Sequence, residues 1–196
     1  MSMFILTSTG LSDEKVRTVV RARVDFSRHK KVAMITTAAR EKEKSPYVQS
    51  DHQELKNIGF SAIDFFDAEK EDATRLRDYD VIYVAGGNTF YLLYHLRKSG
   101  ADLVLKDMVK NRQILYIGVS AGSIIVGKSI ASSTDENNIG LQDLTGLELL
   151  DSVIIPHFGD HKKAIYERML AQGHKVICLK DSEAFIAENN DTCEIL

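Results

Sequence analysis

A serine flanked by glycines is the strongest chemical signal in the chain. Residues 118–122 read Gly-Val-Ser-Ala-Gly, with Ser120 at the centre, and they follow an apolar run. A G-x-S-x-G segment between a strand and a helix presents a strained serine hydroxyl as a nucleophile, because only small residues two positions away let the turn close. The backbone N–H of Ala121 could then help to stabilise an oxyanion. The spacing predicts acyl-transfer chemistry at Ser120, and a closely packed turn of small residues is the alternative.

A second glycine loop follows another strongly apolar run. Gly86, Gly87 and Asn88 separate this run from a predicted helix. Two adjacent glycines let the backbone come close to a ligand and direct N–H groups towards it. We therefore predict that Gly86, Gly87 and Asn88 line the oxyanion and substrate region. A plain turn with Thr89 as the helix cap is the alternative.

A serine nucleophile needs a general base, and the chain has six histidines. His157 differs from the others because it directly follows the apolar run 152–156. That position is the expected carboxyl end of a strand, where α/β proteins bind their ligands. We predict His157 as the base, with the nearby His161 as the alternative.

An acid is also expected, to orient the imidazole and stabilise its charged form. Asp135 lies in a polar loop between Ser120 and His157, which gives the order Ser, Asp, His known for catalytic triads. Asp181, which follows the apolar run 175–179, is the main alternative. Weaker candidates are Glu136, Asp160 and Glu183. A solvated loop carboxylate is the other interpretation of each residue.

Short apolar runs alternate with longer amphipathic stretches along the chain. Runs rich in Val and Ile predict strands at 3–7, 31–37, 59–65, 80–85, 113–118, 152–156 and 175–179, and a further strand-like run covers 184–187. Periodicity predicts helices at 13–27, 45–58, 69–78, 90–99, 101–111 and 162–172. This alternation is typical of an α/β domain with a parallel sheet that is covered on both faces. The serine and histidine loops should then meet beyond the carboxyl ends of the strands.

Composition favours one compact domain over residues 1–196, since 44% of the residues are hydrophobic and 27% are charged. A net charge of -3 and a pI near 6.1 give no basic field for nucleic acid. No apolar run approaches the roughly 20 residues that cross a bilayer, so we expect a cytoplasmic protein without a membrane partner. Cys178 and Cys193 lack metal-site spacing, and neither a disulfide, a metal nor another cofactor is expected.

These motifs resemble the peptidase E (aspartyl dipeptidase) family of serine peptidases, whose fold is related to class I glutamine amidotransferase domains. The matching blocks, in order, are 86–90, 118–122, 134–135 and 156–158. The resemblance implies a single three-layer α/β domain with a mostly parallel sheet of the class I glutamine amidotransferase-like type. It also implies catalytic roles for Ser120 and His157, and it allows either Asp135 or Asp181 as the acid.

The same resemblance implies hydrolysis of dipeptides or short peptides through an acyl-enzyme on Ser120, with a preference for N-terminal aspartate. Such a preference needs a cation, and Lys162, Lys163 and Arg168 are the candidates. One alternative is an esterase that uses the same serine elbow. Others are a non-catalytic amidotransferase-like domain that binds a small ligand, and a peptidase that acts on a polymer such as cyanophycin. We expect a small peptide as the partner of the site and a homodimer as a candidate assembly.

Overall fold

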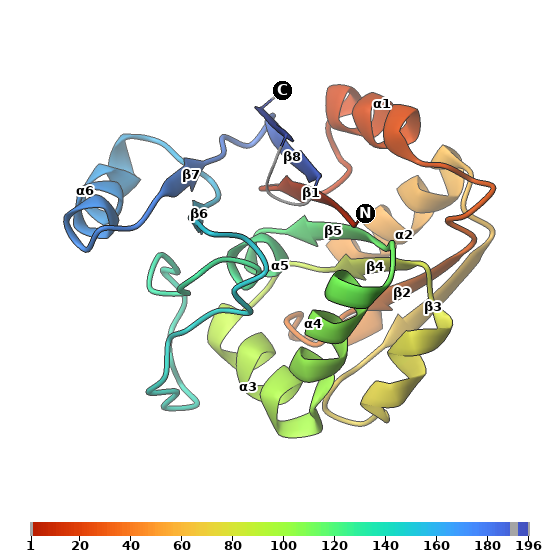
Figure 1. Ribbon diagram of the computed structural model, residues 1–196, viewed down its shortest axis with the longest axis horizontal. Coiled ribbons are helices and arrows are strands. Elements are labelled where there is room, and N and C mark those ends of the chain that lie inside the picture. Colours follow the sequence, from red (N-terminus) through yellow and green to blue (C-terminus); the bar gives the residue numbers. More distant parts are fainter. Residues whose placement is uncertain (1, 189–191, 196) are drawn as a thin grey trace.

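A computed structural model describes residues 2–188 and 192–195, without the side chains of residues 192 and 193. Seven strands form one sheet in the order β3-β2-β4-β5-β1-β8-β9 (Figure 1). They are β1 (Met3–Thr7), β2 (Lys31–Ile35), β3 (Ala62–Phe66), β4 (Val81–Val84), β5 (Leu115–Val119), β8 (Ala184–Glu188) and β9 (Thr192–Ile195). The first five strands are mutually parallel, whereas β8 runs antiparallel to both β1 and β9. The sheet is thus mostly parallel, as predicted.

Helices cover both faces of this sheet (Figure 1). One face carries α1 (Glu14–Arg23) and α2 (Pro46–Ile58), and the other carries η2 (Ala73–Asp78), α3 (Thr89–Ser99), α4 (Ala101–Asn111) and α5 (Ala121–Ile124). Side chains of each strand alternate between the two layers. In β1, for example, Phe4 and Leu6 pack on the α3 side while Ile5 packs on the α1 side. The predicted three-layer α/β architecture is confirmed.

A separate pair of parallel strands lies to one side of the main sheet (Figure 1). It consists of β6 (Val153–Ile155) and β7 (Val176–Cys178), joined through η3 (Asp160–Lys162) and α6 (Lys163–Ala171). The runs predicted as strands at 152–156 and 175–179 are therefore strands, but they do not extend the main sheet. The edge of β1 that they could have joined is already occupied by β8.

Several helices and strands begin or end at residues other than those predicted from the sequence, for local reasons. The strand expected from residue 59 starts at Ala62, because Gly59 adopts a φ of 129° and ends α2. The helix expected at 69–78 is shortened to the 3-10 turn η2, which begins after the Asp72 side chain accepts a hydrogen bond from the Thr74 N–H. A further 3-10 turn, η1 (Lys42–Lys44), precedes α2. The terminal strand β9 was not predicted.

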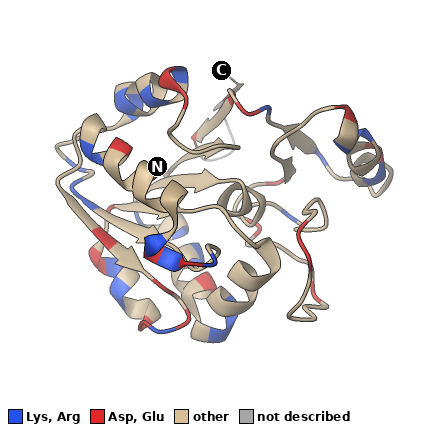
Figure 2. Ribbon diagram, turned by 180° about the vertical axis from the view of Figure 1, so that it is seen from behind, with Lys and Arg blue, Asp and Glu red and all other residues tan. Residues whose placement is uncertain are grey.

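Charged residues of both signs are interspersed along the helices and loops (Figure 2). Most ion pairs among the described residues lie at the surface, such as Arg23 with Glu194 at 2.8 Å and Lys175 with Asp151 at 2.9 Å. Exposed pairs of this kind contribute little to stability. Of the helices formed by the described residues, none combines the length and the apolar character that a membrane span requires.

Asp51 is a buried carboxylate whose ionisation opposes folding. It lies on α2 with an exposed fraction of 5%, and its Oδ1 accepts a hydrogen bond from the Leu11 N–H at 3.1 Å. Burial raises the pKa of Asp51 from 3.8 to about 6. The folded state therefore holds a proton that the unfolded state has lost, and stability falls as the pH rises from about 4 to about 6.

We expect Asp51→Asn to remove this pH dependence. The shift of about two pKa units corresponds to about 3 kcal/mol, so the variant should gain up to this amount in unfolding free energy at pH 7 relative to wild type. The amide oxygen of asparagine can still accept from Leu11. Urea unfolding between pH 4 and pH 8 measures the effect, with the exposed Asp78→Asn as the control. Parallel pH curves for wild type and Asp51→Asn would contradict the prediction.

Candidate active site

Ser120 sits at a sharp turn between β5 and α5. Its φ of 47° is positive, which is strained for a residue with a side chain, and its N–H donates to the Thr7 carbonyl at 2.9 Å. A Cβ at Gly122 would lie 2.2 Å from the Val84 oxygen, and one at Gly118 would lie 2.7 Å from the Gly122 oxygen. Both glycines are therefore required by close backbone approach, as the sequence pattern predicts.

His157 reaches Ser120 from the end of β6. Its Nε2 lies 3.1 Å from Ser120 Oγ, and the imidazole is half-buried. The backbone of His157 also has a positive φ, 53°, and its N–H donates to Ser8 Oγ at 2.9 Å. The alternative base, His161, is exposed, and no contact among the described residues joins it to Ser120. The geometry thus pairs Ser120 with His157.

Asp181 is the carboxylate that contacts the imidazole, with its Oδ1 2.6 Å from His157 Nδ1. The parallel pairing of β6 and β7 explains the contact. Leu179 donates its N–H to the Ile155 carbonyl at 3.0 Å, so the loops that leave both strands emerge at the same edge. The carboxylate favours a proton on Nδ1, which leaves Nε2 to accept the proton of Ser120.

Asp135, predicted as the acid ahead of Asp181, does not contact His157. Its Oδ2 accepts hydrogen bonds from the Thr89 N–H at 2.8 Å, the Thr89 hydroxyl at 2.7 Å and the Ser133 hydroxyl at 2.9 Å. A carboxylate at the first turn of a helix satisfies N–H groups that have no partner within the helix. Asp135 therefore fixes its own loop to the start of α3, whereas Asp181, the alternative acid, is the one that contacts the imidazole.

Asn88 joins the glycine loop to the same polar loop. Its Oδ1 accepts from the Tyr91 N–H at 2.9 Å and so caps α3, while its Nδ2 donates to the Glu136 carbonyl at 2.8 Å. Both polar ends of the side chain are thus used within the protein. Asn88 lines the cavity beside the glycine loop, and its contacts hold the polar loop against the start of α3.

Gly86 and Gly87 lie against the serine turn. A Cβ at Gly86 would be 3.4 Å from Ser120 Cβ. Gly87 has a φ of 134°, and a Cβ there would lie 2.1 Å from the Ala38 oxygen. Within residues 2–188 and 192–195, the backbone N–H groups of Gly87 and Ala121 have no protein acceptor. These two donors are available to an oxygen bound beside Ser120.

A cavity of about 660 Å³ opens next to the glycine loop. Its lining includes Tyr47, Gly87, Asn88, Tyr91, Arg40 and Glu136. The Tyr47 hydroxyl donates to the Gly86 carbonyl at 3.3 Å, which ties the cavity wall to the residue that packs on Ser120.

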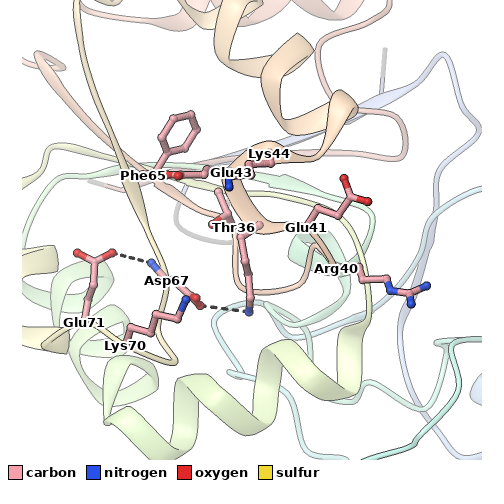
Figure 3. Close-up of a pocket in the computed structure, with 10 residues that line it drawn as sticks. Thr36, Arg40, Glu41, Glu43, Lys44, Phe65, Asp67, Lys70 and Glu71 are labelled. Carbon is pink, nitrogen blue, oxygen red and sulfur yellow. Dashed lines mark hydrogen bonds and ion pairs between the residues drawn. The ribbon is translucent and has the colours of Figure 1, made fainter.

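Arg40 lines both this cavity and a neighbouring pocket of about 450 Å³, which is shown in Figure 3. Its side chain is exposed and extends away from the group formed by Asp67, Lys70 and Glu71 (Figure 3). Among the described residues no carboxylate pairs with it. Arg40 was not among the site residues predicted from the sequence, because nothing in the loop after β2 distinguishes it from other surface cations.

Comparison with known proteins identifies the family. The model of peptidase family S51 matches residues 3–195, nearly the whole chain. The chain belongs to peptidase family S51. It is 33% identical over 175 residues to an uncharacterized peptidase of Listeria innocua, a match that covers 79% of this chain and 82% of the relative. It is 33% identical over 116 residues to peptidase E of Shewanella amazonensis, covering 59% of this chain and 48% of that protein.

A crystal structure supports the same assignment for this S51 chain. A peptidase E candidate from Listeria monocytogenes superposes with a TM-score of 0.81 at 27% identity, covering 100% of this chain and 98% of the other. The resemblance to the peptidase E family is thereby confirmed. Membership of a peptidase family favours the peptidase over the esterase alternative.

Each of the three cations expected to recognise a substrate carboxylate already contacts a group of this S51 peptidase. Lys162 is buried and donates to the Pro156 carbonyl at 2.7 Å. Lys163 pairs with Asp160 at 2.8 Å. Arg168 donates to the Ala131 carbonyl at 2.8 Å. Each of the three side chains thus has a structural partner, whereas Arg40 beside the cavity has no carboxylate partner among the described residues.

In the described part of the S51 chain, no group of three or more His, Cys, Asp or Glu side chains is placed so that it could hold a metal ion. Cys178 is a free thiol, and burial raises the pKa of Cys178 to about 11. The prediction that Cys193 forms no disulfide concerns a side chain outside the described residues.

Proposed function

We propose that this S51 peptidase is a serine peptidase that hydrolyses dipeptides or short peptides through an acyl-enzyme on Ser120. The observation that carries the proposal is one chain of contacts: Ser120 Oγ lies 3.1 Å from His157 Nε2, and His157 Nδ1 lies 2.6 Å from Asp181 Oδ1. This is the arrangement of nucleophile, base and orienting acid that acyl transfer requires.

In the proposed mechanism His157 takes the Ser120 proton as Oγ attacks the peptide carbonyl carbon. The carbonyl π electrons move to oxygen and form an oxyanion. When the C–N bond breaks, His157 gives its proton to the leaving amine, and the acyl group remains on Ser120. Water, deprotonated by His157, then releases the acid and restores the serine. The Asp181 carboxylate holds the imidazole and stabilises its charged form.

The oxyanion is assigned to the backbone N–H groups of Ala121 and Gly87. Ala121 follows the nucleophile directly, and Gly87 belongs to the loop whose Gly86 packs against Ser120. Fixed donors of this kind are often the largest single contribution to acyl-transfer catalysis, because they need no reorganisation as charge develops.

The proposal is tested by turnover of a peptide panel, combined with labelling by a fluorophosphonate probe and identification of the labelled residue. The panel contains dipeptides and tripeptides with and without N-terminal aspartate, together with cyanophycin. Labelling of Ser120 and cleavage of short peptides would support the proposal. Cleavage of cyanophycin alone would move the substrate to a polymer, and the absence of both labelling and cleavage would favour the ligand-binding alternative.

We further propose that Arg40 supplies the cation for an acidic substrate group, such as the side chain of an N-terminal aspartate. Support comes from its place in the lining of the cavity of about 660 Å³ and from the absence of a carboxylate partner for it among the described residues. Lys42, the other cation of that cavity, already contacts Asp67 at 3.3 Å and Glu69 at 3.2 Å.

Arg40→Gln should raise KM for aspartyl peptides about 10-fold and leave kcat nearly unchanged. The reason is the loss of one charge-assisted contact, which is made equally in the ground state and the transition state. Steady-state kinetics on matched Asp-X and Ala-X peptides measures the change, with the exposed Arg21→Gln on α1 as the control. Equal KM changes for both peptides would refute the role in acidic recognition.

A further inference from the structure

Three consecutive residues at the end of β1 contact the three members of the proposed triad. The Thr7 carbonyl accepts from the Ser120 N–H at 2.9 Å. Ser8 Oγ accepts from the His157 N–H at 2.9 Å. Thr9 Oγ1 donates to the Asp181 carbonyl at 2.7 Å. We name Thr7, Ser8 and Thr9 the β1 exit segment.

This segment bridges two sheets that share no strand pairing among the described residues. Ser120 follows β5 of the main sheet, whereas His157 and Asp181 follow the separate strands β6 and β7. The distance between nucleophile and base therefore depends on how the loops of the small sheet are fixed against the main sheet. Catalytic groups must be held to within about 0.5 Å, which demands direct support.

Ser8 gives that support from a buried position, with an exposed fraction of only 1%. Its hydroxyl accepts from the His157 N–H and donates to the Leu179 carbonyl at 3.0 Å. One side chain of the main sheet thus links the loops that leave β6 and β7. The contact also fixes His157 where its backbone φ is 53°, a conformation that needs external support.

We propose that Ser8 and Thr9 are positioning residues, which set His157 and Asp181 at the right distance from Ser120. The proposal rests on the proposed triad. Neither hydroxyl takes part in bond making, because Ser8 acts on the backbone of His157 and Thr9 acts on the backbone of Asp181. A buried serine that only satisfies backbone groups is the plainer interpretation, so the test must separate positioning from general stability.

Thr9→Val is the main test, since it keeps the side-chain shape and removes the donor to Asp181. We expect the maximal rate of labelling by a fluorophosphonate probe, kinact, to fall about 10-fold or more while KI stays nearly unchanged, because misplacement of catalytic groups by about 1 Å can cost up to about 100-fold in rate. Thr9→Ser keeps the hydroxyl and should restore the rate. The control is Thr18→Val, which removes an exposed hydroxyl that donates to the Glu14 carbonyl at 2.9 Å in α1.

The decisive comparison repeats Thr9→Val in an Asp181→Asn background. If Thr9 acts through Asp181, most of its effect should disappear there, whereas general destabilisation would act equally in both backgrounds. Ser8→Ala should also lower kinact, and it is measured well below its thermal midpoint because burial makes it the less tolerated change.

Different results would overturn the proposed function and the positioning role of Ser8 and Thr9. Absence of probe labelling at Ser120 in the wild type would overturn the proposed function and the positioning role together. Normal labelling of the wild type and an unchanged kinact in Thr9→Val and Ser8→Ala would overturn the positioning role alone. An equal effect of Thr9→Val in both backgrounds would also overturn it.

Discussion

Ser120→Ala should reduce kcat at least about 1000-fold on any peptide that the wild type cleaves. Without Oγ no acyl-enzyme can form, and the residual rate is limited to what the oxyanion donors and substrate binding provide. Folding should be nearly unaffected, because the backbone N–H of residue 120 still donates to the Thr7 carbonyl and the removed hydroxyl is only half-buried.

The measurement is kcat and the thermal midpoint for Ser120→Ala and wild type, prepared in parallel. Ser99→Ala serves as the matched control, since Ser99 ends α3 and its hydroxyl makes only local contacts, donating to the Leu96 carbonyl and accepting from the Ala101 N–H. Hydrolysis that persists in Ser120→Ala would assign the nucleophile to another group. Loss of activity together with a large fall in the thermal midpoint would show that the comparison had measured folding instead of catalysis.

Asp181→Asn should lower kcat by about 100-fold to 10,000-fold. An amide in place of the carboxylate can donate to His157 Nδ1 and so hold the tautomer whose Nε2 carries a proton, which cannot accept the proton of Ser120. It also removes the negative charge that stabilises the imidazolium. Asp181 is largely exposed, with 67% of its side chain accessible, so the change should disturb folding little.

Asp135→Asn is the matched comparison, because it makes the same chemical change in the acid that does not contact the base. It weakens the contacts with Thr89 and Ser133 at the start of α3, and it should lower the unfolding free energy by about 1 kcal/mol. We expect kcat to fall less than about 10-fold. A larger loss of kcat in Asp135→Asn than in Asp181→Asn would reverse the assignment drawn from the geometry.

The residues that could be recognised from the sequence are those that directly follow a single predicted strand. Ser120 and His157 each follow an apolar run directly, so the rule that sites lie beyond strand ends was sufficient to single out each of them. The glycines of both loops could be recognised for the same reason. The layers and the parallel order also follow from the alternation of strands and helices along the chain.

The contact between acid and base depends on which strands are neighbours. Asp135 was favoured by its order in the sequence, whereas Asp181 reaches His157 because β6 and β7 pair in parallel. That pairing was the missing signal, since both strands were predicted and both precede a candidate residue. Arg40 could not be found from the sequence, because its proposed role depends on a cavity formed by separate segments of the chain.

Because the site is divided between two sheets, we expect heat to inactivate the protein before the central sheet unfolds. The nucleophile depends on the long central sheet with cores on both faces, while the base and acid depend on a two-strand unit attached at its side. Such small units can open with a lower free energy than the whole domain. Loss of activity on heating would then report the release of this unit, and spectroscopic melting of the central sheet would follow at a higher temperature.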